Sequence, residues 1–521
     1  MKFLKAVTTV GFYTLLSRVF GFVRDILIAS VLGAGGVADA FFLALRLPNL
    51  FRRLFAEGAF SAAFVPIFSN ILERNGRDQA RVFAEQVFSM LIFILAFFVA
   101  LIELVMPWVM LGLAPGFAGL PGKMELATEL SRIAFPYILF ISLVSLQSGI
   151  LNALGRFAAA AAAPILFNFV LIIALLGFSD YLQTSGHVLA WGVFLAGVVQ
   201  FFWLSWNCKT VGFSLQFRWP EITEKVKLLG ARILPVVFST SIYQINLLIG
   251  TILATLVADG AVSYLYYADR VTQLPLGVVG VAVGTALLPM LSQQLAAGDD
   301  VAAANSQNRG LEFAFLLVLP ASAALLVIAQ PVITVLFERG AFGPDQAMAT
   351  ADALKAYATG LPAYVLIRVL SPGFFAREDT KTPVQVAAMA MGLNVVLNLV
   401  FMQIWGYVGL ALASSLAAWV NAFGLAIILR RRGYLSIDKR LRRRLPRIFL
   451  ATVGMAISLF LLQRELLEIC DAQYLEHVSD LGLLIGAGLF VYWCLVHIFG
   501  AARWEDLKVL SRRSGSDLGG S

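Results

Sequence analysis

The sequence predicts an all-α polytopic membrane protein, and three observations lead to that prediction. The chain is 60% hydrophobic and 13% charged, with a mean hydropathy of +0.84, whereas soluble domains are usually about 45–50% apolar and about 25% charged. Apolar runs of about 20 residues, long enough to cross a bilayer, recur from one end of the chain to the other. These runs are too long and too uniformly apolar for barrel strands, so helices must satisfy the backbone in lipid.

We expect about fourteen spanning helices, several of them kinked at proline or glycine. The first apolar segment is interrupted by Arg18, Arg24 and Asp25, and no small-residue cleavage site ends a short core. We therefore interpret this segment as a spanning helix and not as a cleaved signal. The expected spans are residues 6–33, 37–70, 83–113, 126–155, 158–179, 187–207, 229–258, 262–297, 310–338, 345–376, 384–404, 408–429, 447–463 and 480–500.

An internal repeat organises these helices. The string "FVPIFS" at 64–69 is echoed by "LLPMLS" at 287–292, and "NFVL" at 168–171 by "NVVL" at 394–397. The repeated unit holds six helices, and an even number returns the chain to its starting side. The two copies should therefore be parallel lobes related by a pseudo-two-fold axis along the membrane normal, with a substrate path between them. The predicted domains are a lobe at 1–208, a cytoplasmic linker at 209–228, a lobe at 229–430, and helices thirteen and fourteen with a cytoplasmic tail at 431–521.

The distribution of basic residues predicts the orientation. Residues 430–447 carry nine Lys and Arg against one acid, Asp438, whereas the following loop at 464–480 is mainly acidic. Basic loops stay on the cytoplasmic side, so both termini should be cytoplasmic. The segment 430–447 should also attract anionic membrane lipids, at about 1 kcal/mol per basic residue. The net charge of +8 belongs to such loops, and we expect no nucleic-acid partner.

Charged residues inside the first two predicted spans are the main functional signal. Five arginines accompany three acids there, a surplus of two positive charges, and each charge at the bilayer centre costs roughly 2.5–3.5 kcal/mol. These residues should face a cavity, and the planar guanidinium fork suits a phosphate or carboxylate. The alternative is that the charges pair among themselves or reach the membrane interface. That alternative is favoured for Arg46, and the cavity is favoured for Arg18, Arg24, Arg52 and Arg270. The residues are Arg18, Arg24, Arg46, Arg52, Arg53, Asp25, Asp39 and Glu57, and the second repeat adds Asp269 and Arg270.

Other chemical signals are weak. No GxxxxGK[ST] loop for ATP and no metal-ligand spacing occurs in the sequence, so we expect no cofactor, no metal and no enzyme activity. Asn394 and Asn398 lie one turn apart, and they would either coordinate a coupling cation or bond between helices; the second reading is favoured.

Several stretches resemble the MurJ (MviN) family of lipid II flippases in the MOP exporter superfamily. They are "SRVFGFVRD" at 17–25, "ADAFFLALRLPNLFRRLFAEGAFSAAFVPIFS" at 38–69, "YYADRVTQLPLGVVGVAVGTALLPMLS" at 266–292 and "FFAREDTKTPV" at 374–384. The resemblance covers essentially the whole chain. It implies fourteen helices, two six-helix lobes and alternating access in the bacterial inner membrane, with lipid II as the cargo.

The resemblance also implies roles for individual residues. Arg18, Arg24, Arg52 and Arg270 would hold the diphosphate of the cargo, with Arg53 a weaker candidate. Asp25 and Asp39 would orient or release these arginines through ion pairs, and Asp269 lies beside Arg270. Glu57 would belong to a gate or hinge. Sodium-binding members use carboxylates where this chain has Asn394 and Asn398, so membrane potential or another ion gradient could drive transport.

Three alternative functions remain open at this point. The first is export of another polyprenyl-diphosphate-linked oligosaccharide, which would use the same basic cavity. The second is an enzyme acting on the lipid carrier, which would need a catalytic acid or metal cluster. The third is a non-transporting scaffold for cell-wall synthases, in which changes to the arginines would be tolerated.

Overall fold

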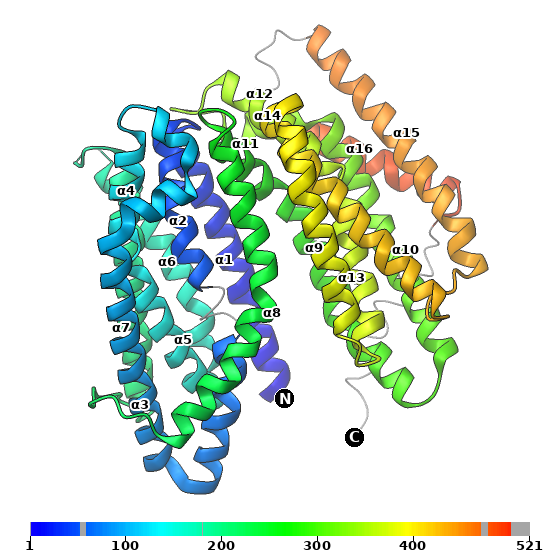
Figure 1. Cartoon of the computed structure of the whole chain (residues 1–521). Coiled ribbons are helices and arrows are strands. Elements are labelled where there is room, and N and C mark those ends of the chain that lie inside the picture. Colours follow the sequence, from blue (N-terminus) through cyan, green and yellow to red (C-terminus); the bar gives the residue numbers. More distant parts are fainter. Residues whose placement is uncertain (1, 53–58, 180, 470–477, 502–521) are drawn as a thin grey trace. The chain divides into compact units, whose positions relative to one another are not determined.

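The computed structural model describes residues 2–52, 59–179, 181–469 and 478–501, and the regular elements in these ranges are helices (Figure 1). In chain order they are α1 (Lys2–Leu32), α2 (Gly36–Phe51), α3 (Ala59–Leu113), the 3₁₀ helix η2 (Pro115–Gly119), α4 (Lys123–Ala134), α5 (Tyr137–Ala153), α6 (Phe157–Phe178), α7 (Ser185–Thr210), α8 (Glu224–Thr255), α9 (Ala261–Ala296), α10 (Asp300–Val327), α11 (Ala329–Phe337), α12 (Pro344–Ala358), α13 (Leu361–Phe375), α14 (Lys381–Arg431), α15 (Lys439–Ile469) and α16 (Val478–Ile498).

The all-helical, membrane-spanning character of the chain is confirmed. Within the described ranges, nine helical stretches are long and apolar enough to cross a membrane. Their bounds differ from the expected spans, because α14 runs through two of them and α4 with α5 divides another. Apolar runs reveal where lipid contact is possible, but the local backbone geometry decides where a helix stops.

Two long helices each contain a backbone reversal at a single glycine. Gly76 in α3 has φ +82°, and Gly406 in α14 has φ +58°, values that residues with a Cβ rarely adopt. The arms of α3 pack on each other, since the rings of Phe64 and Phe83 stack with centroids 5.8 Å apart. α3 is therefore two packed helices joined at a glycine.

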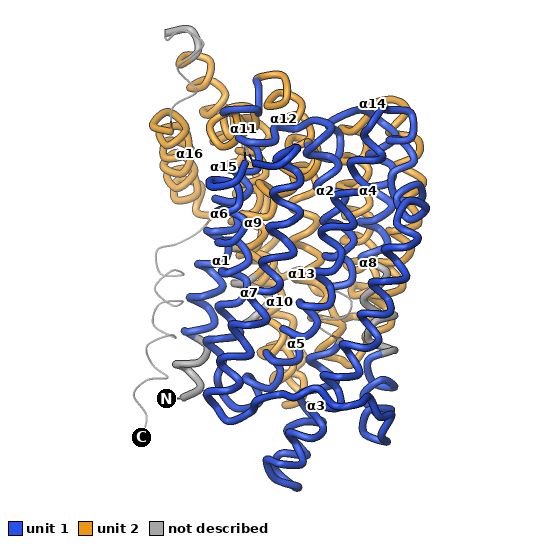
Figure 2. Tube along the Cα trace, turned by 90° about the vertical axis from the view of Figure 1, so that its left-hand side faces the viewer, with its two compact units in different colours: residues 1–263, 339–343 blue, residues 264–338, 344–521 orange. Residues whose placement is uncertain are grey.

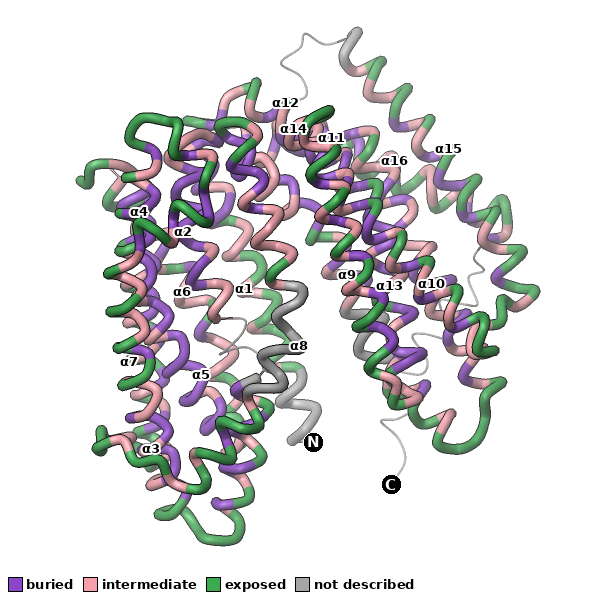
Figure 3. The backbone as a smooth tube through the Cα atoms, viewed as in Figure 1, coloured by how far each residue is buried: buried purple, intermediate pink, exposed green. Residues whose placement is uncertain are grey.

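The chain divides into two compact units, shown in Figure 2. Unit 1 comprises residues 1–263 and 339–343. In it α1 packs on α6, α6 on α7, α5 on α3 and α7, and α2 on α4. Most helices bury one face and expose the other (Figure 3). A row of buried phenylalanines fills the contact of α3 with α5, and full burial of each such ring contributes roughly 1.5–3 kcal/mol; the row includes Phe60, Phe64, Phe68 and Phe83.

Unit 2 comprises residues 264–338 and 344–521. In it α10 packs on α13 and α15, α13 on α14, and α15 on α16. Its core takes leucines from α9, among them Leu287 and Leu291, and packs them against α10 and α13. The division into lobes at 1–208 and 229–430 stays a prediction, since these units are defined by proximity alone.

Candidate functional site

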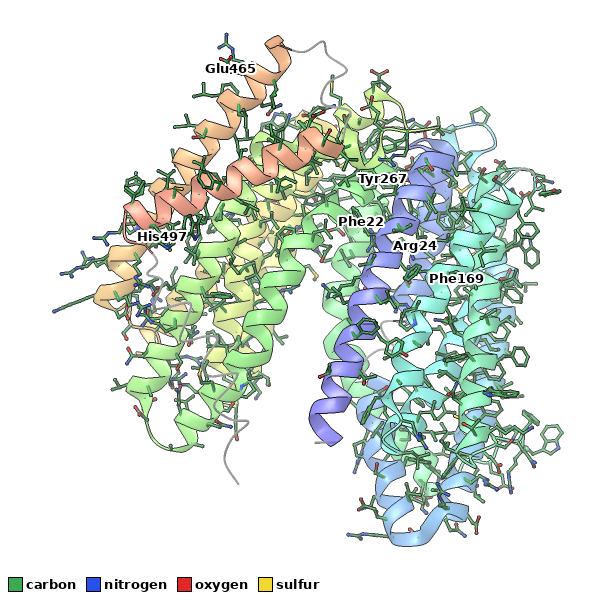
Figure 4. The ribbon with its side chains drawn as sticks, turned by 180° about the vertical axis from the view of Figure 1, so that it is seen from behind. Phe22, Arg24, Phe169, Tyr267, Glu465 and His497 are labelled. Atoms are coloured by element: carbon green, nitrogen blue, oxygen red, sulfur yellow. The ribbon has the colours of Figure 1, made fainter. Side chains whose placement is uncertain are left out.

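Arg24 is the most deeply embedded of the predicted arginines. Its exposed fraction is 9%, and it lies on α1 beside α6 (Figure 4). Its Nη2 donates to Asp25 Oδ1 at 2.7 Å, and its Nη1 donates to Asn168 Oδ1 at 2.8 Å. The amide nitrogen of Asn168 donates in turn to the Ser17 carbonyl at 3.0 Å. Asn168 thus ties the guanidinium to α6, and Asp25 balances a charge that would be costly to bury alone.

Arg52, at the end of α2, lies near the cluster formed by Arg24, Asp25 and Asn168. It caps the C-terminal end of α2, half-buried, and its Nε donates to Asn49 Oδ1 at 3.3 Å. Arg24 and Arg52 both act electrostatically on Tyr137. The Tyr137 ring lies 5.5 Å from that of Phe167, and the Arg24 guanidinium lies 5.8 Å from the same Phe167 ring. Two predicted arginines from different helices therefore lie near Tyr137, which is buried, and Arg24 also contacts the half-buried Phe167.

Arg18 occupies a different environment on α1. Its side chain is exposed, and among the described residues no hydrogen bond or ion pair involves it. The neighbouring face of α1 is apolar and open within unit 1, as shown by Phe12, Leu15, Val19 and Val23. Arg53 and Glu57, also predicted site residues, lie outside the described residues.

Asp39 lies in the first turn of α2, and its partners differ from those predicted. Its Oδ2 accepts from Lys123 Nζ at 2.9 Å and from the Gly260 backbone N–H at 2.8 Å. Its Oδ1 accepts from the backbone N–H and hydroxyl of Ser263 at 2.9 and 2.6 Å. Lys123 also pairs with Asp259. The predicted ion pair of Asp39 with an arginine is therefore wrong for this conformation: the carboxylate caps the start of α9 and binds a lysine.

A cap of this kind suits the chemistry of a helix start. The first backbone N–H groups of a helix lack intrahelical acceptors and carry partial positive charge. A carboxylate with no exposed surface satisfies one such group in the first turn of α9 and the N–H of the residue just before it, while the Lys123 ammonium offsets its charge. Asp39 therefore fastens α2 to the beginning of α9.

The predicted second-repeat residues lie on α9 within unit 2. Both Asp269 and Arg270 are half-buried. The Arg270 guanidinium lies 4.6 Å from the centroid of the Tyr266 ring, a cation–π geometry. Asp269 Oδ1 accepts from Gln273 Nε2 at 3.3 Å.

Asn394 and Asn398 are both buried in α14, and Asn398 Nδ2 donates to Asn394 Oδ1. The favoured reading of a bond between helices is therefore corrected to a bond along one helix. Within the described part of the chain, no group of three or more His, Cys, Asp or Glu side chains could hold a metal ion.

Several arginines of the basic segment 430–447 form ion pairs within unit 2. Arg440, Arg444 and Arg309 all bind Glu312 of α10, whose exposed fraction is 8%. Arg309 also binds Asp438, which lies just before α15. These pairs fasten the segment to unit 2. The arginines of this segment that are exposed and form no ion pair among the described residues are Arg430, Arg431, Arg442, Arg443 and Arg447.

A second anchor of this segment involves the loop between α13 and α14. The hydroxyl and the backbone N–H of Thr382 donate to Asp379 at 2.6 and 3.0 Å, and Arg432 binds the same carboxylate. These bonds to Thr382 and Arg432 lower the pKa of Asp379 to about 2. The carboxylate therefore stays charged through the physiological range.

Sequence reasoning missed three residues that complete the site. Lys123 and Ser263 hold Asp39, and Asn168 holds Arg24. Asn168 had a usable signal, because it is the one polar side chain in the apolar run "ILFNFVL" at 165–171. Lys123 had none, since it follows a Pro-Gly turn and resembles an ordinary loop lysine.

The nine membrane-length helical stretches of the described ranges define a polytopic helical membrane protein, with a buried ion pair in its first helix. Its fold is similar to a solved "Inward-facing conformation of a multidrug resistance MATE family transporter of the MOP superfamily", with a TM-score of 0.65 and 16% identity, covering 80% of this chain and 94% of that one. This likeness concerns the fold alone.

More specifically, the chain belongs to the MurJ family. Residues 28–469 match the family described as "Lipid II flippase MurJ". The chain is 43% identical to a "Probable lipid II flippase MurJ" of Rhizobium meliloti (strain 1021), covering 99% of this chain and 97% of the relative. It is 42% identical to one of Rhizobium tropici, covering 96% and 95%. A solved "Lipid II flippase MurJ, inward closed conformation" has a TM-score of 0.80 and 25% identity, covering 96% and 99%. The family is one of flippases and not of enzymes.

Proposed function

We propose that this chain translocates lipid II, the undecaprenyl-diphosphate-linked peptidoglycan precursor, from the cytoplasmic to the periplasmic leaflet of a bacterial inner membrane. Membership of the MurJ family over nearly the whole chain supports this cargo. The single structural observation that carries the mechanism is the buried Arg24, held by one carboxylate and one neutral amide.

The diphosphate of the cargo would replace Asp25 at the Arg24 guanidinium. A phosphate offers the same paired acceptor oxygens as a carboxylate, with more negative charge. Asp25 keeps the arginine neutralised when no cargo is bound, and it competes for the arginine when the cargo must leave. Such competition gives a site that binds on one side of the membrane and releases on the other, as a transport cycle requires.

Further arginines would extend this clamp. Arg52 shares the surroundings of Tyr137 with Arg24, and Arg18 lies exposed on α1, where no carboxylate among the described residues binds it. Arg270, beside Asp269 in the second repeat, and Arg53 next to Arg52 are proposed as further contacts. Bidentate arginine contacts fit a diphosphate better than point charges do.

Asp39 would act as a conformational latch. Its bonds join α2 to the first residues of α9, so any cycle that moves these two helices apart must break them. Glu57 is proposed as part of a gate on the family resemblance alone.

The remaining features of the proposal concern topology and surroundings. We infer fourteen spans in two parallel six-helix lobes related by an axis along the membrane normal, from the internal repeat. Both termini would be cytoplasmic, because the basic segment 430–447 should lie inside. The exposed arginines of that segment would contact anionic lipids, and membrane potential or an ion gradient would drive transport. Cell-wall synthases are proposed as partners.

The proposed cargo is tested by complementation in cells depleted of their own lipid II flippase, with lipid II accessible at the outer surface as the readout. The wild-type chain should restore both growth and exposure of lipid II. A well-expressed wild-type chain that restores neither would show that the cargo is a different polyprenyl-diphosphate-linked molecule.

A further inference from the structure

A cavity of about 300 Å³ lies in unit 1 at the C-terminal end of α7, apart from the arginine site. It is bounded by the middle of α3, by α5, by the last turns of α7 and by the linker that follows them. Its polar lining includes Gln147, Ser205, Lys209 and Ser214, and its walls are aromatic, with Phe202 and Trp206 the most exposed.

Gln147 gives this cavity an acceptor that awaits a donor. The side chain is only 2% exposed, and its Nε2 donates to Ser205 Oγ at 2.7 Å. Its Oε1 is buried and has no hydrogen-bond partner among the described residues. Leaving such an atom unpaired costs about 1–3 kcal/mol. A ligand that donates a hydrogen bond to it therefore gains more binding free energy than it would from the same bond at the protein surface.

The cavity lies where the apolar surface of α7 gives way to polar chain. Trp203 and Trp206 occupy the last turns of the helix, with exposed fractions of 40% and 70%. Indole rings of this kind gather at the level of lipid headgroups. Lys209, exposed in the final turn, places a cation at the same level, where the phosphate of a membrane lipid is found.

The linker wall of the cavity is fixed by α3 and is not a loose loop. The backbone N–H of Arg218 donates to Ser89 Oγ at 2.8 Å, and that of Gln216 donates to Glu85 Oε1 at 3.4 Å. Arg218 also forms an ion pair with Glu85, which is buried. These bonds hold Ser214 beside the cavity before any ligand binds, which lowers the ordering cost of binding.

We propose that this cavity binds the headgroup of a glycerophospholipid of the surrounding leaflet. The lipid phosphate pairs with Lys209, and the Gln147 side chain turns toward the cavity so that its buried Oε1 accepts from an ammonium or hydroxyl of the headgroup. The acyl chains leave along Phe202 and Trp206. The cavity therefore selects lipids that carry both a phosphate and a donor, independently of lipid II transport.

The test is photo-crosslinking of the full chain in nanodiscs with diazirine lipids of equal acyl length, mapped to peptides covering residues 201–215. Phosphatidylethanolamine offers an ammonium donor, phosphatidylglycerol offers hydroxyl donors, and phosphatidylcholine has the phosphate without a donor. We expect at least one of the first two to label this segment more than phosphatidylcholine does, and the better one identifies the donor. Lys209→Gln should reduce that labelling about five-fold, the factor expected of a partly exposed ion pair.

Two variants sharpen the test. Gln147→Leu should remove the preference for lipids with a donor, while Lys225→Gln, an exposed lysine outside the cavity, should leave labelling unchanged. The proposal is overturned if phosphatidylcholine labels residues 201–215 as strongly as both other lipids do. Labelling of Lys209→Gln at the wild-type level would overturn it as well.

Discussion

Two arginine clusters of the molecule differ in how their charges are shared. In unit 1, Arg24 binds the Asp25 carboxylate and the neutral Asn168 amide. In unit 2, one carboxylate, Glu312, serves three guanidinium groups, those of Arg309, Arg440 and Arg444. The first cluster lies among apolar helices of the membrane-embedded part, and the second ties a basic segment to the middle of α10.

The difference shows which cluster can exchange partners. An arginine held by one acid and one amide accepts an incoming anion if that anion displaces a single carboxylate. An acid shared among three arginines cannot be displaced without loosening all of them. We therefore infer that the unit 1 cluster is a binding site and that the unit 2 cluster is a structural fastening.

The largest expected effect comes from removing the guanidinium of unit 1. Arg24→Ala should lower the rate at which lipid II appears at the outer surface by about 100-fold or more, because truncating one member of a buried charge pair costs about 2–5 kcal/mol. Arg24→Lys keeps the charge without the fork and should give an intermediate rate. An Arg24→Ala protein that is expressed normally and transports like wild type would remove the contrast between the two clusters.

The second test breaks the fastening of unit 2. Glu312→Gln should destabilise the protein by about 1–3 kcal/mol, because it removes the charged acceptor of Arg440 and Arg444 and leaves Arg309 with Asp438 alone. Thermal unfolding in detergent should show this loss, and proteolysis should become faster in segment 430–447. Glu221→Gln, at an exposed acid of the linker, is the matched control. Normal stability with slow transport would instead place Glu312 in the transport cycle.

The third test gives Arg24 a second acidic partner within the protein, which would compete with the cargo. Asn168→Asp places a second carboxylate beside Arg24, which should hold the guanidinium more firmly against the cargo. We expect lipid II exposure to fall about ten-fold, since about 1.4 kcal/mol of added competition corresponds to that factor. Thermal stability should also fall, because an ionised aspartate cannot donate to the Ser17 carbonyl as the Asn168 amide does. Asn152→Asp, at an exposed position, controls for the added charge. Unchanged transport would argue against exchange at Arg24.

The smallest effect is a pH dependence at the second anchor of segment 430–447. The pKa of Asp379 is about 2 in the folded chain, below its ordinary value of 3.8. Its contribution to stability is therefore complete above pH 3.8 and is lost as the pH falls from there through 2. Asp379→Asn should reduce thermal stability slightly at pH 6 but not at pH 2. A difference between the two proteins that grows on acidification would contradict this assignment.

The sequence predicts the class of fold and part of the site. The rest of the site could not be predicted, because its residues lie far apart in the chain. Apolar runs indicate helices, and charges inside those runs single out Arg24 and Asp25, which are neighbours in the chain and bind each other. Asp39 is different, because its partners lie 84 residues away at Lys123 and 224 residues away at Ser263. The separation from Ser263 is close to the offset of the internal repeat, but a repeat relates equivalent positions without predicting that they touch, so only the packed helices reveal these bonds.

Helix bounds show the same limit. Hydropathy places 384–404 and 408–429 as two spans, and Gly406, with φ +58°, marks the reversal between them inside α14. The close approach of the two arms also requires Gly409, where a Cβ would lie 2.2 Å from the Phe401 carbonyl oxygen. Hydropathy predicts which segments can contact lipid. The two glycines are required by backbone geometry and close packing, which hydropathy does not measure.

The central claim, exchange of Asp25 for the cargo diphosphate at Arg24, is tested most directly by measuring lipid II binding to purified wild type, Arg24→Ala and Asp25→Asn by native mass spectrometry. Arg24→Ala should lose most bound lipid II. Asp25→Asn should bind it more tightly than wild type, because the diphosphate becomes the main counter-ion of a buried guanidinium. Equal binding by all three proteins would contradict the exchange and leave Arg24 a structural residue.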